Sequence, residues 1–166
     1  MNLCFVDIET TGLDAQKHEI IEIGAIHTDG AKLESYVLPS HIETADPESL
    51  AINGYTEKGW QQMDAITLPD ALQSLNVIAN GAYFIAYNAT FDWSFLQKAY
   101  SDYGIEPNFH YHRLDLMTLV WGGADDPPLS LREFCLVNGL ETEPSVHRAI
   151  NGAKCALAAY KHHAGL

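Results

Sequence analysis

The sequence predicts an α/β domain built on a mixed five-stranded sheet with helices on both faces. Three short apolar segments rich in strand-forming residues open the chain, at residues 3–8, 20–27 and 32–38. The turn at residues 28–30 (TDG) joins the last two segments as a hairpin. Helical and strand segments then alternate, which is typical of parallel strands connected by helices.

The remaining elements are predicted from local signals in chain order. A short helix is expected from Pro47 to Ile52, because Asp46 suits its N-cap and Pro47 its first position. The further segments are a helix over residues 69–79 ended by Asn80-Gly81, a strand over 83–87, a helix over 90–103 stopped by Gly104, a weaker strand over 112–116 that can run straight into a helix, and helices over 129–137 and 148–162.

Length and composition indicate one globular domain over residues 1–166, with 47% apolar and 19% charged residues. The three cysteines (Cys4, Cys135 and Cys155) lie far apart, so we expect buried free thiols rather than a zinc site or disulfides. No segment has the pattern of a signal peptide or a membrane span. A cytoplasmic protein with no membrane partner is therefore expected.

The charge balance limits how the chain could bind nucleic acid. Nine Lys and Arg residues face 22 Asp and Glu residues, a formal net charge of −13. This argues against gripping a long nucleic acid by neutralising its phosphates. A nuclease remains open, because divalent cations supply local positive charge and a short substrate needs few phosphate contacts.

Asp7 and Glu9 form the first candidate site. Residues i and i+2 of a strand point to the same side, so both carboxylates lie on one face at the end of the first strand, while Val6 and Ile8 point into the core. Two carboxylates this close repel unless a cation lies between them, and Mg²⁺ or Mn²⁺ prefers such oxygen ligands. The alternative is an ordinary solvated acidic strand end.

Asp92 is the second candidate. It falls in the first turn of the helix predicted over residues 90–103, which Thr90 or Asn88 could cap. An acidic residue there also simply complements the helix dipole. Asp115, in the segment RLDLMT, is interpreted as structural, binding backbone or a neighbouring basic group.

Three motifs together resemble a known family. They are DIETTGL at residues 7–13, NATFD at 88–92 followed by Phe95-Leu96, and HRA at 147–149. This series resembles the DEDDh branch of the DEDD (DnaQ-like) 3′–5′ exonucleases, and the resemblance extends from Asp7 to Ala153. It implies a ribonuclease H-like fold and hydrolysis of phosphodiester bonds at DNA or RNA 3′ ends, single-stranded or short, releasing nucleoside 5′-monophosphates.

The resemblance also implies residue roles. Two ions, Mg²⁺ or Mn²⁺, would be held by Asp7, Glu9 and Asp92, with Asp7 bridging both, and His147 would be the general base, a role that suits an imidazole. The residues that match substrate-contacting positions are Thr10, Thr11, Leu13, Asn53, Gly54, Asn88 and Phe91. The aromatic rings of Trp60, Phe91 and Trp93 could stack on bases or belong to the core.

Gly152 departs from the family pattern. The family has an aspartate five residues after the histidine, and glycine is also unfavourable inside a helix, by about 1 kcal/mol relative to alanine. Either close packing excludes a side chain there, or the position changed without regard to stability. We expect weak, manganese-favouring or absent activity, with the amide of Asn151 or water as substitute ligands. The alternative function is a catalytically degenerate nucleic-acid-binding domain or a subunit of a polymerase or repair complex, and a homodimer is also open.

Overall fold

The computed structural model describes residues 1–122 and 130–166. Its sheet has the order β3-β2-β1-β4-β5. The strands are β1 (Leu3–Thr10), β2 (Ile20–His27), β3 (Lys32–Tyr36), β4 (Tyr83–Ala86) and β5 (Arg113–Asp115). Pairs β1–β2 and β2–β3 are antiparallel, whereas β4 is parallel to both β1 and β5. The predicted mixed five-stranded sheet is confirmed.

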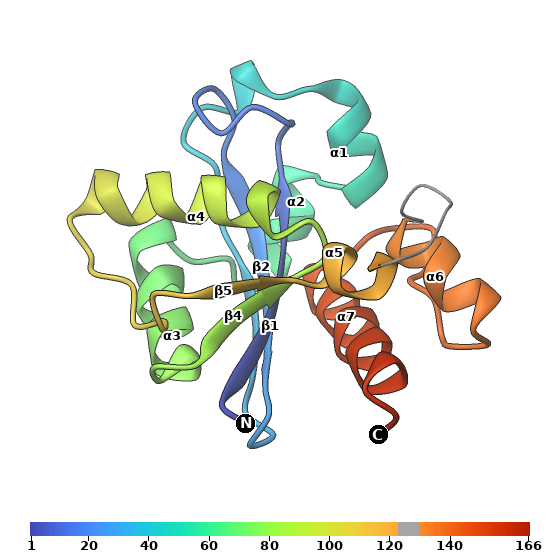
Figure 1. Cartoon of the computed structure of the whole chain (residues 1–166). Helices are drawn as coiled ribbons and strands as arrows, with labels where there is room; N and C mark the ends of the chain where they lie inside the picture. Colours follow the sequence, from blue (N-terminus) through green and yellow to red (C-terminus); the bar gives the residue numbers. More distant parts are fainter. Residues whose placement is uncertain (123–129) are drawn as a thin grey trace.

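Helices cover both faces of this sheet (Figure 1). Helices α3 (Leu68–Ala79) and α4 (Ala89–Tyr103) lie on one face, and α7 (Ala149–His163) crosses β1 and β2 on the other. Helices α5 (Leu116–Trp121) and α6 (Leu131–Val137) pack beside α7. The short η1 (Ile42–Thr44), α1 (Pro47–Asn53) and α2 (Glu57–Gln62) connect β3 to α3.

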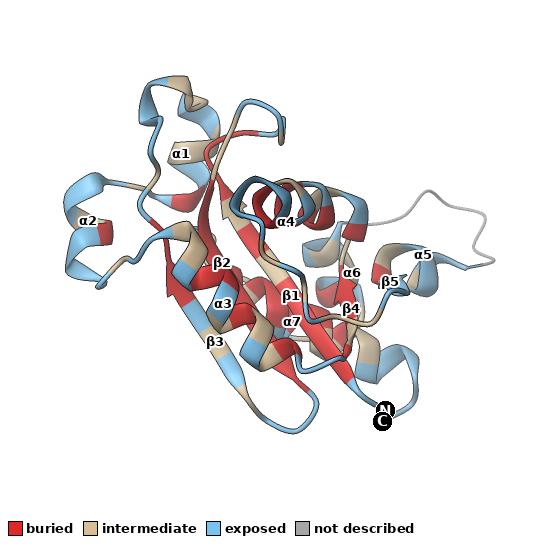
Figure 2. Ribbon diagram, turned by 90° about the vertical axis from the view of Figure 1, so that its left-hand side faces the viewer, coloured by how far each residue is buried: buried red, intermediate tan, exposed pale blue. Residues whose placement is uncertain are grey.

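The alternation of β1 assigns its side chains to two cores. Cys4, Val6 and Ile8 pack with α3 and α4, and Leu3 and Phe5 pack with α7. Asp7 and Glu9 continue the second series, so they point towards the α7 face beyond its apolar part. Figure 2 shows the buried residues concentrated along β1, β2 and the inner sides of the helices.

Several predicted elements differ from the structure in detail. Helix α2 was not predicted, because Gly59 interrupts its short helical pattern; Thr56 caps it. The predicted strand over 32–38 ends at Tyr36, and the expected continuation of 112–116 into a helix is confirmed as α5. Leu129, the predicted start of the next helix, lies outside the described residues; Ser130 caps α6 through a capping box.

The expectation of buried free cysteines is confirmed for Cys4, Cys135 and Cys155. Of the helices in residues 1–122 and 130–166, none combines the length and the apolar character that crossing a bilayer requires.

Candidate active site

The end of β1 carries the two carboxylates on the side that faces α7. Asp7 lies opposite Gly24 of β2, and Glu9 lies opposite Glu22. Side chains of directly paired residues share a face, so Glu9 and Glu22 are neighbours across the strands. Both Asp7 and Glu9 are partly buried. Three acidic side chains therefore lie side by side under the first turn of α7.

Asp92 joins them from the other layer of the fold. It occupies the first turn of α4 and is 3% exposed. The backbone N–H of Ile8 donates to Asp92 Oδ1 at 3.2 Å, which ties α4 to the end of β1 between Asp7 and Glu9. Neither predicted cap holds this helix: Asn88 is the N-cap residue, but in the left-handed conformation and without a side-chain bond. The helix start is held instead by Asp115, whose Oδ2 accepts the N–H of Ala89 at 2.7 Å.

Burial and like charge together raise the pKa values of the clustered carboxyl groups. Burial raises the pKa of Asp7 well above its usual range, and the charges of Asp92 and Glu9 raise it further. Burial, followed by the charge of Glu22, raises the pKa of Glu9 to about 8. Burial also raises the pKa of Asp92, although its backbone hydrogen bonds oppose this. Like charges and desolvation thus act together on the three residues.

His147 lies at the entry to α7 and is fixed through its backbone. Its N–H donates to Ile52 O of α1 at 3.1 Å, and its side chain is half-buried. The neighbouring Arg148 donates from Nη1 to Asn53 O and stands over the Trp60 ring at 5.2 Å. These contacts join the start of α7 to the end of α1. They fix the backbone of His147 two residues before Ala149, whose N–H is bonded to the buried Glu22.

Glu22 is a site residue that sequence reasoning missed. Its side chain is fully buried; Oε1 accepts the N–H of Ala149 at 3.0 Å at the start of α7, and Oε2 has no hydrogen-bond partner among the described residues. Burial raises its pKa to about 7, against the lowering effect of Arg148. The available signal was a glutamate inside the otherwise apolar strand IIEIGAI.

Gly152 lies directly against Asp7. A Cβ added at residue 152 would stand 2.3 Å from Asp7 Oδ2 and 2.5 Å from its Cγ. The carboxylate of Asp7 therefore fills the space where a side chain at 152 would begin. The group in the way is the movable end of a side chain, so a side chain at 152 requires Asp7 to rotate and not the backbone to shift.

The structure gives Asn151 a different role from the substitute ligand expected above. Its Oδ1 accepts a hydrogen bond from Lys154 Nζ at 3.1 Å, on the outer side of α7. Asn151 and Lys154 line a hollow of about 250 Å³ together with residues of the preceding loop. The amide oxygen is thus engaged away from Asp7, and the expectation that it replaces the missing carboxylate is not supported.

The predicted substrate-contacting residues fall into two groups. Thr10, Thr11 and Asn53 are buried, and their side chains bond Gly12 O, Glu19 N and Thr10 O respectively, so they shape the loops around the site. Gly54 ends α1 in the left-handed conformation. Leu13 (76% exposed), Asn88 (exposed) and Phe91 (half-buried) remain accessible. Substrate contact by any of the seven stays a prediction.

Two of the three candidate stacking rings belong to the core. Trp60 is 2% exposed, donates from Nε1 to Ile21 O at 2.7 Å, and packs edge-on against Tyr36. Trp93 is 9% exposed, and the Arg113 guanidinium covers its ring at 3.7 Å. Phe91, packed against Phe95, is the one of the three that a base could still reach.

Asp115 has the structural role expected of it. Oδ2 holds the N–H of Ala89, and Oδ1 accepts the N–H of Thr118 at 2.7 Å, capping α5. One carboxylate therefore organises the starts of both α4 and α5 at the edge of the site.

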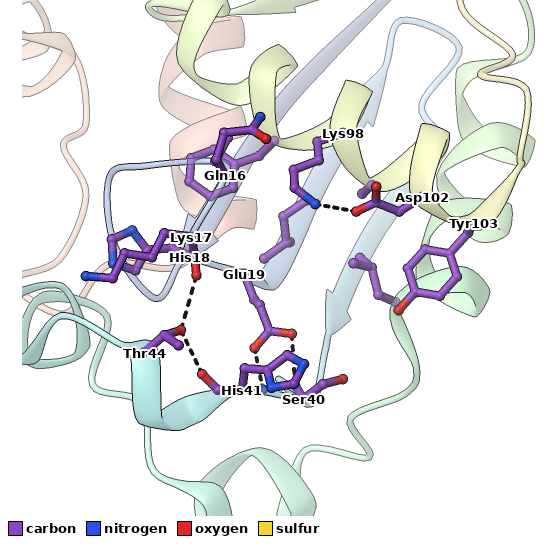
Figure 3. A pocket seen from close by; sticks show the side chains of 15 residues that line it. Gln16, Lys17, His18, Glu19, Ser40, His41, Thr44, Lys98, Asp102 and Tyr103 are labelled. Atoms are coloured by element: carbon purple, nitrogen blue, oxygen red, sulfur yellow. Dashed lines mark hydrogen bonds and ion pairs between the residues drawn. The ribbon is translucent and has the colours of Figure 1, made fainter.

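A separate hollow of about 490 Å³ lies beside the loop that follows β1 (Figure 3). Its polar groups bond one another: Glu19 accepts the backbone N–H groups of Ser40 and His41, and Lys98 pairs with Asp102. None of Asp7, Glu9, Asp92 and His147 lines it. We therefore place the chemistry at the acidic cluster and not in this hollow.

The donor chemistry at the cluster fits a hard divalent cation. Buried carboxylates raise one another's pKa, and Oε2 of Glu22 and Oε1 of Glu143 lack partners within the described residues. As the side chains stand, however, no three His, Cys, Asp or Glu residues in 1–122 and 130–166 are arranged to hold a metal ion. Asp92 is turned to Ile8 N and Asp7 to Gly152, so ion binding requires these short side chains to rotate.

Comparison with known proteins also indicates an exonuclease. The RNase T family model, described as exonuclease, matches residues 4–160. Ribonuclease T of Klebsiella pneumoniae is 28% identical over 153 residues, which cover 81% of this chain and 71% of that protein. The PolC-type DNA polymerase III of Caldanaerobacter subterraneus is 31% identical over 155 residues, 89% of this chain but 10% of the polymerase.

Solved structures share the fold. E. coli exonuclease I in complex with a dT13 oligonucleotide matches with a TM-score of 0.80 at 19% identity, over 97% of this chain and 40% of that one. The chain thus spans about a tenth of the polymerase relatives and less than half of exonuclease I.

Proposed function

This chain belongs to the RNase T family of exonucleases, of the DnaQ-like, ribonuclease H-like group, and from that premise we propose that it is a divalent-metal-dependent 3′–5′ exonuclease. The family resemblance of the three motifs is confirmed by these comparisons. Its products would be nucleoside 5′-monophosphates removed one at a time from a 3′ end.

One observation carries the proposal: separate elements bring carboxylates to one end of β1, and the backbone of His147 is fixed where α7 begins. Asp7 and Glu9 come from β1, Asp92 from α4, and His147 from the segment entering α7. The hydrogen bond from Ile8 N to Asp92 and that from His147 N to Ile52 O fix two of these elements. Such buried acidic groups are costly unless they bind cations.

Each residue would have the role that suits its chemistry. Asp7, Glu9 and Asp92 would hold two ions, Mg²⁺ or Mn²⁺, which when bound would supply the positive charge that activates water and offsets the charge of the phosphate. His147 would accept a proton from the attacking water, because an imidazole gains and loses a proton near neutral pH. Arg148, bonded to Asn53 O, would keep His147 in place.

The substrate is inferred to be short or single-stranded DNA or RNA. A net charge of −13 leaves few cations for phosphates far from the site. Of the seven predicted substrate-contacting residues, Leu13, Asn88 and Phe91 have accessible side chains, which suit contact with one or two terminal nucleotides. A polymerase or repair partner is consistent with the PolC-type relatives.

Gly152 is expected to weaken the activity. Position 152 would carry a metal-binding carboxylate in the family pattern but has none, so the metal site would have one negative ligand fewer. Manganese should support the reaction better than magnesium, because it binds nitrogen and oxygen sites more tightly.

Stepwise shortening of 5′-labelled single-stranded DNA and RNA, with Mg²⁺ or Mn²⁺ and with the released mononucleotides identified by chromatography, tests the proposal. Gly152→Asp should raise the rate by about tenfold or more, as expected for restoring a metal-site carboxylate. Gly152→Ala is the matched control: it makes the same demand on Asp7 as aspartate does, since both add a Cβ, but it supplies no charge. If Gly152→Asp is no faster than Gly152→Ala, the assignment of residue 152 is wrong.

The second candidate is a nucleic-acid-binding domain that has lost turnover, and Gly152 is the observation that favours it. This reading predicts that the parent binds an oligonucleotide but releases no mononucleotide with either metal. Restored cleavage by Gly152→Asp would then identify a degenerate exonuclease. Absence of cleavage by both chains would leave binding as the function.

A further inference from the structure

The loop before α7 brings a carboxylate of its own to the turn that contains Gly152. Cys155, one turn beyond Gly152 on α7, donates from Sγ to Glu141 O at 3.5 Å. Arg132 of α6 donates from Nη1 to Glu143 O at 3.0 Å. The loop over residues 141–143 is therefore fixed to both helices, and its third residue, Glu143, is held beside the acidic cluster.

The side chain of Glu143 points inward. Its Oε1 is buried and has no hydrogen-bond partner among the described residues. Its charge acts on both Asp7 and Glu9, and the side chains of His147 and Arg132 lie near enough to lower the pKa of Glu143 against the effect of burial. A buried carboxylate oxygen that lacks a donor destabilises the fold, so its inward position calls for a partner.

Two other polar side chains of this region already have structural duties, although Oε2 of Glu22 has no partner among the described residues. Glu22 Oε1 caps the start of α7, and Asn151 Oδ1 accepts from Lys154. Glu143 is thus the acidic residue near Gly152 that combines a free inward oxygen with no structural duty for its carboxylate among the contacts described.

Building on the function proposed above, we propose that Glu143 replaces the missing carboxylate at position 152 and is the fourth acidic ligand of the divalent-metal site, with Asp7 and Glu9. A glutamate on a loop reaches further than an aspartate on α7 would, so the ligand can arrive without a Cβ at 152 displacing Asp7. Carboxylate oxygen is the donor that Mg²⁺ and Mn²⁺ prefer.

Titration of the full chain with Mn²⁺, followed by calorimetry without substrate, tests this inference. Glu143→Gln should weaken Mn²⁺ binding at least tenfold or remove one binding site. Glu141→Gln is the matched control, because it removes an exposed carboxylate from the same loop and should leave binding unchanged. Circular dichroism of each variant establishes that it is folded.

The same titration in the Gly152→Asp background separates a ligand from a positioning residue. If Glu143 takes the place of a carboxylate at position 152, Glu143→Gln should have less than about a threefold effect in the Gly152→Asp background. An equal loss in both backgrounds would mean that Glu143 acts through His147, and the inference would be wrong. Should Gly152→Asp fail to fold, the parent titration decides alone: unchanged Mn²⁺ binding by Glu143→Gln, or no Mn²⁺ binding by the parent, overturns the inference.

These outcomes are independent of cleavage. A parent that binds Mn²⁺ through Glu143 but releases no mononucleotide would retain this inference while the exonuclease proposal fails. A parent that cleaves, with Mn²⁺ binding and cleavage unaffected by Glu143→Gln, would retain the exonuclease proposal and refute the ligand.

Discussion

Replacing Gly24 with alanine adds a methyl group where the backbone of α7 already lies. The new Cβ would stand 2.2 Å from the carbonyl carbon of Ala149 and 2.3 Å from Ile150 N. These atoms cannot move alone, because the N–H of Ala149 is bonded to the buried Glu22 carboxylate. The whole first turn of α7 must therefore shift away from β2.

The expected cost follows from the kind of atom that is displaced. Overpacking a well-filled core costs about 1–3 kcal/mol, and a backbone neighbour places this substitution at the upper end, about 3 kcal/mol. For a chain of this length that corresponds to a fall in Tm of roughly 6–12 °C. Since His147 lies two residues before α7, the shift should also lower any exonuclease rate.

Urea unfolding followed by circular dichroism and tryptophan fluorescence measures the loss. Gly152→Ala is an instructive comparison, because its Cβ meets the movable carboxylate of Asp7 and alanine recovers about 1 kcal/mol of helix propensity. Its free energy of unfolding should stay within about 1 kcal/mol of the parent. If Gly24→Ala unfolds within about 0.5 kcal/mol of the parent with an unchanged m value, α7 is not seated on β2 as described, and the placement of His147 fails with it.

Two further predictions concern charge. Burial raises the pKa of Glu9 to about 8 and that of Glu22 to about 7; because folding favours their protonated forms, this contribution to stability is present below about pH 4.5, their unfolded pKa, and is lost as the pH rises through 7 to 8. In EDTA the protein should therefore resist urea better at pH 5 than at pH 8. Glu9→Gln should reduce this difference, and Mn²⁺ should restore stability at pH 8. A stability that rises from pH 5 to pH 8 in EDTA would refute the burial of these acids. Asp115→Ala removes the acceptor for Ala89 N and Thr118 N, so it should lower the free energy of unfolding in urea by about 1–2 kcal/mol. Asp115→Asn should lower it less, because the amide oxygen can still accept one bond. An unchanged unfolding midpoint would show that neither bond contributes.

Local patterns in the sequence determined the elements and the direction of the first acidic pair. The period of two in LCFVDIE placed Val6 and Ile8 in one core and turned Asp7 and Glu9 towards the opposite face. Asp46 and Pro47 predicted the start of α1 correctly, and the position of Asp92 in the first turn of α4 followed from the strand before it. These features depend on residues close together in the chain, so the sequence alone could specify them.

Tertiary packing decided which residues surround Asp7 and Glu9 and which aromatic rings are buried. In the sequence, Trp60 and Trp93 could equally be rings that stack on bases or rings of the core, and the fold buries both. Glu22 and Glu143 reach the cluster only because β2 pairs with β1 and the loop after α6 returns along α7.

Gly152 shows most directly which conclusions came from the sequence and which needed the structure. The sequence revealed that a carboxylate is missing there, because that needs only the spacing from His147. The structure alone revealed that Asp7 fills the vacated space and that Glu143 stands nearby, because such contacts join segments more than a hundred residues apart and depend on how closely a helix can approach a sheet.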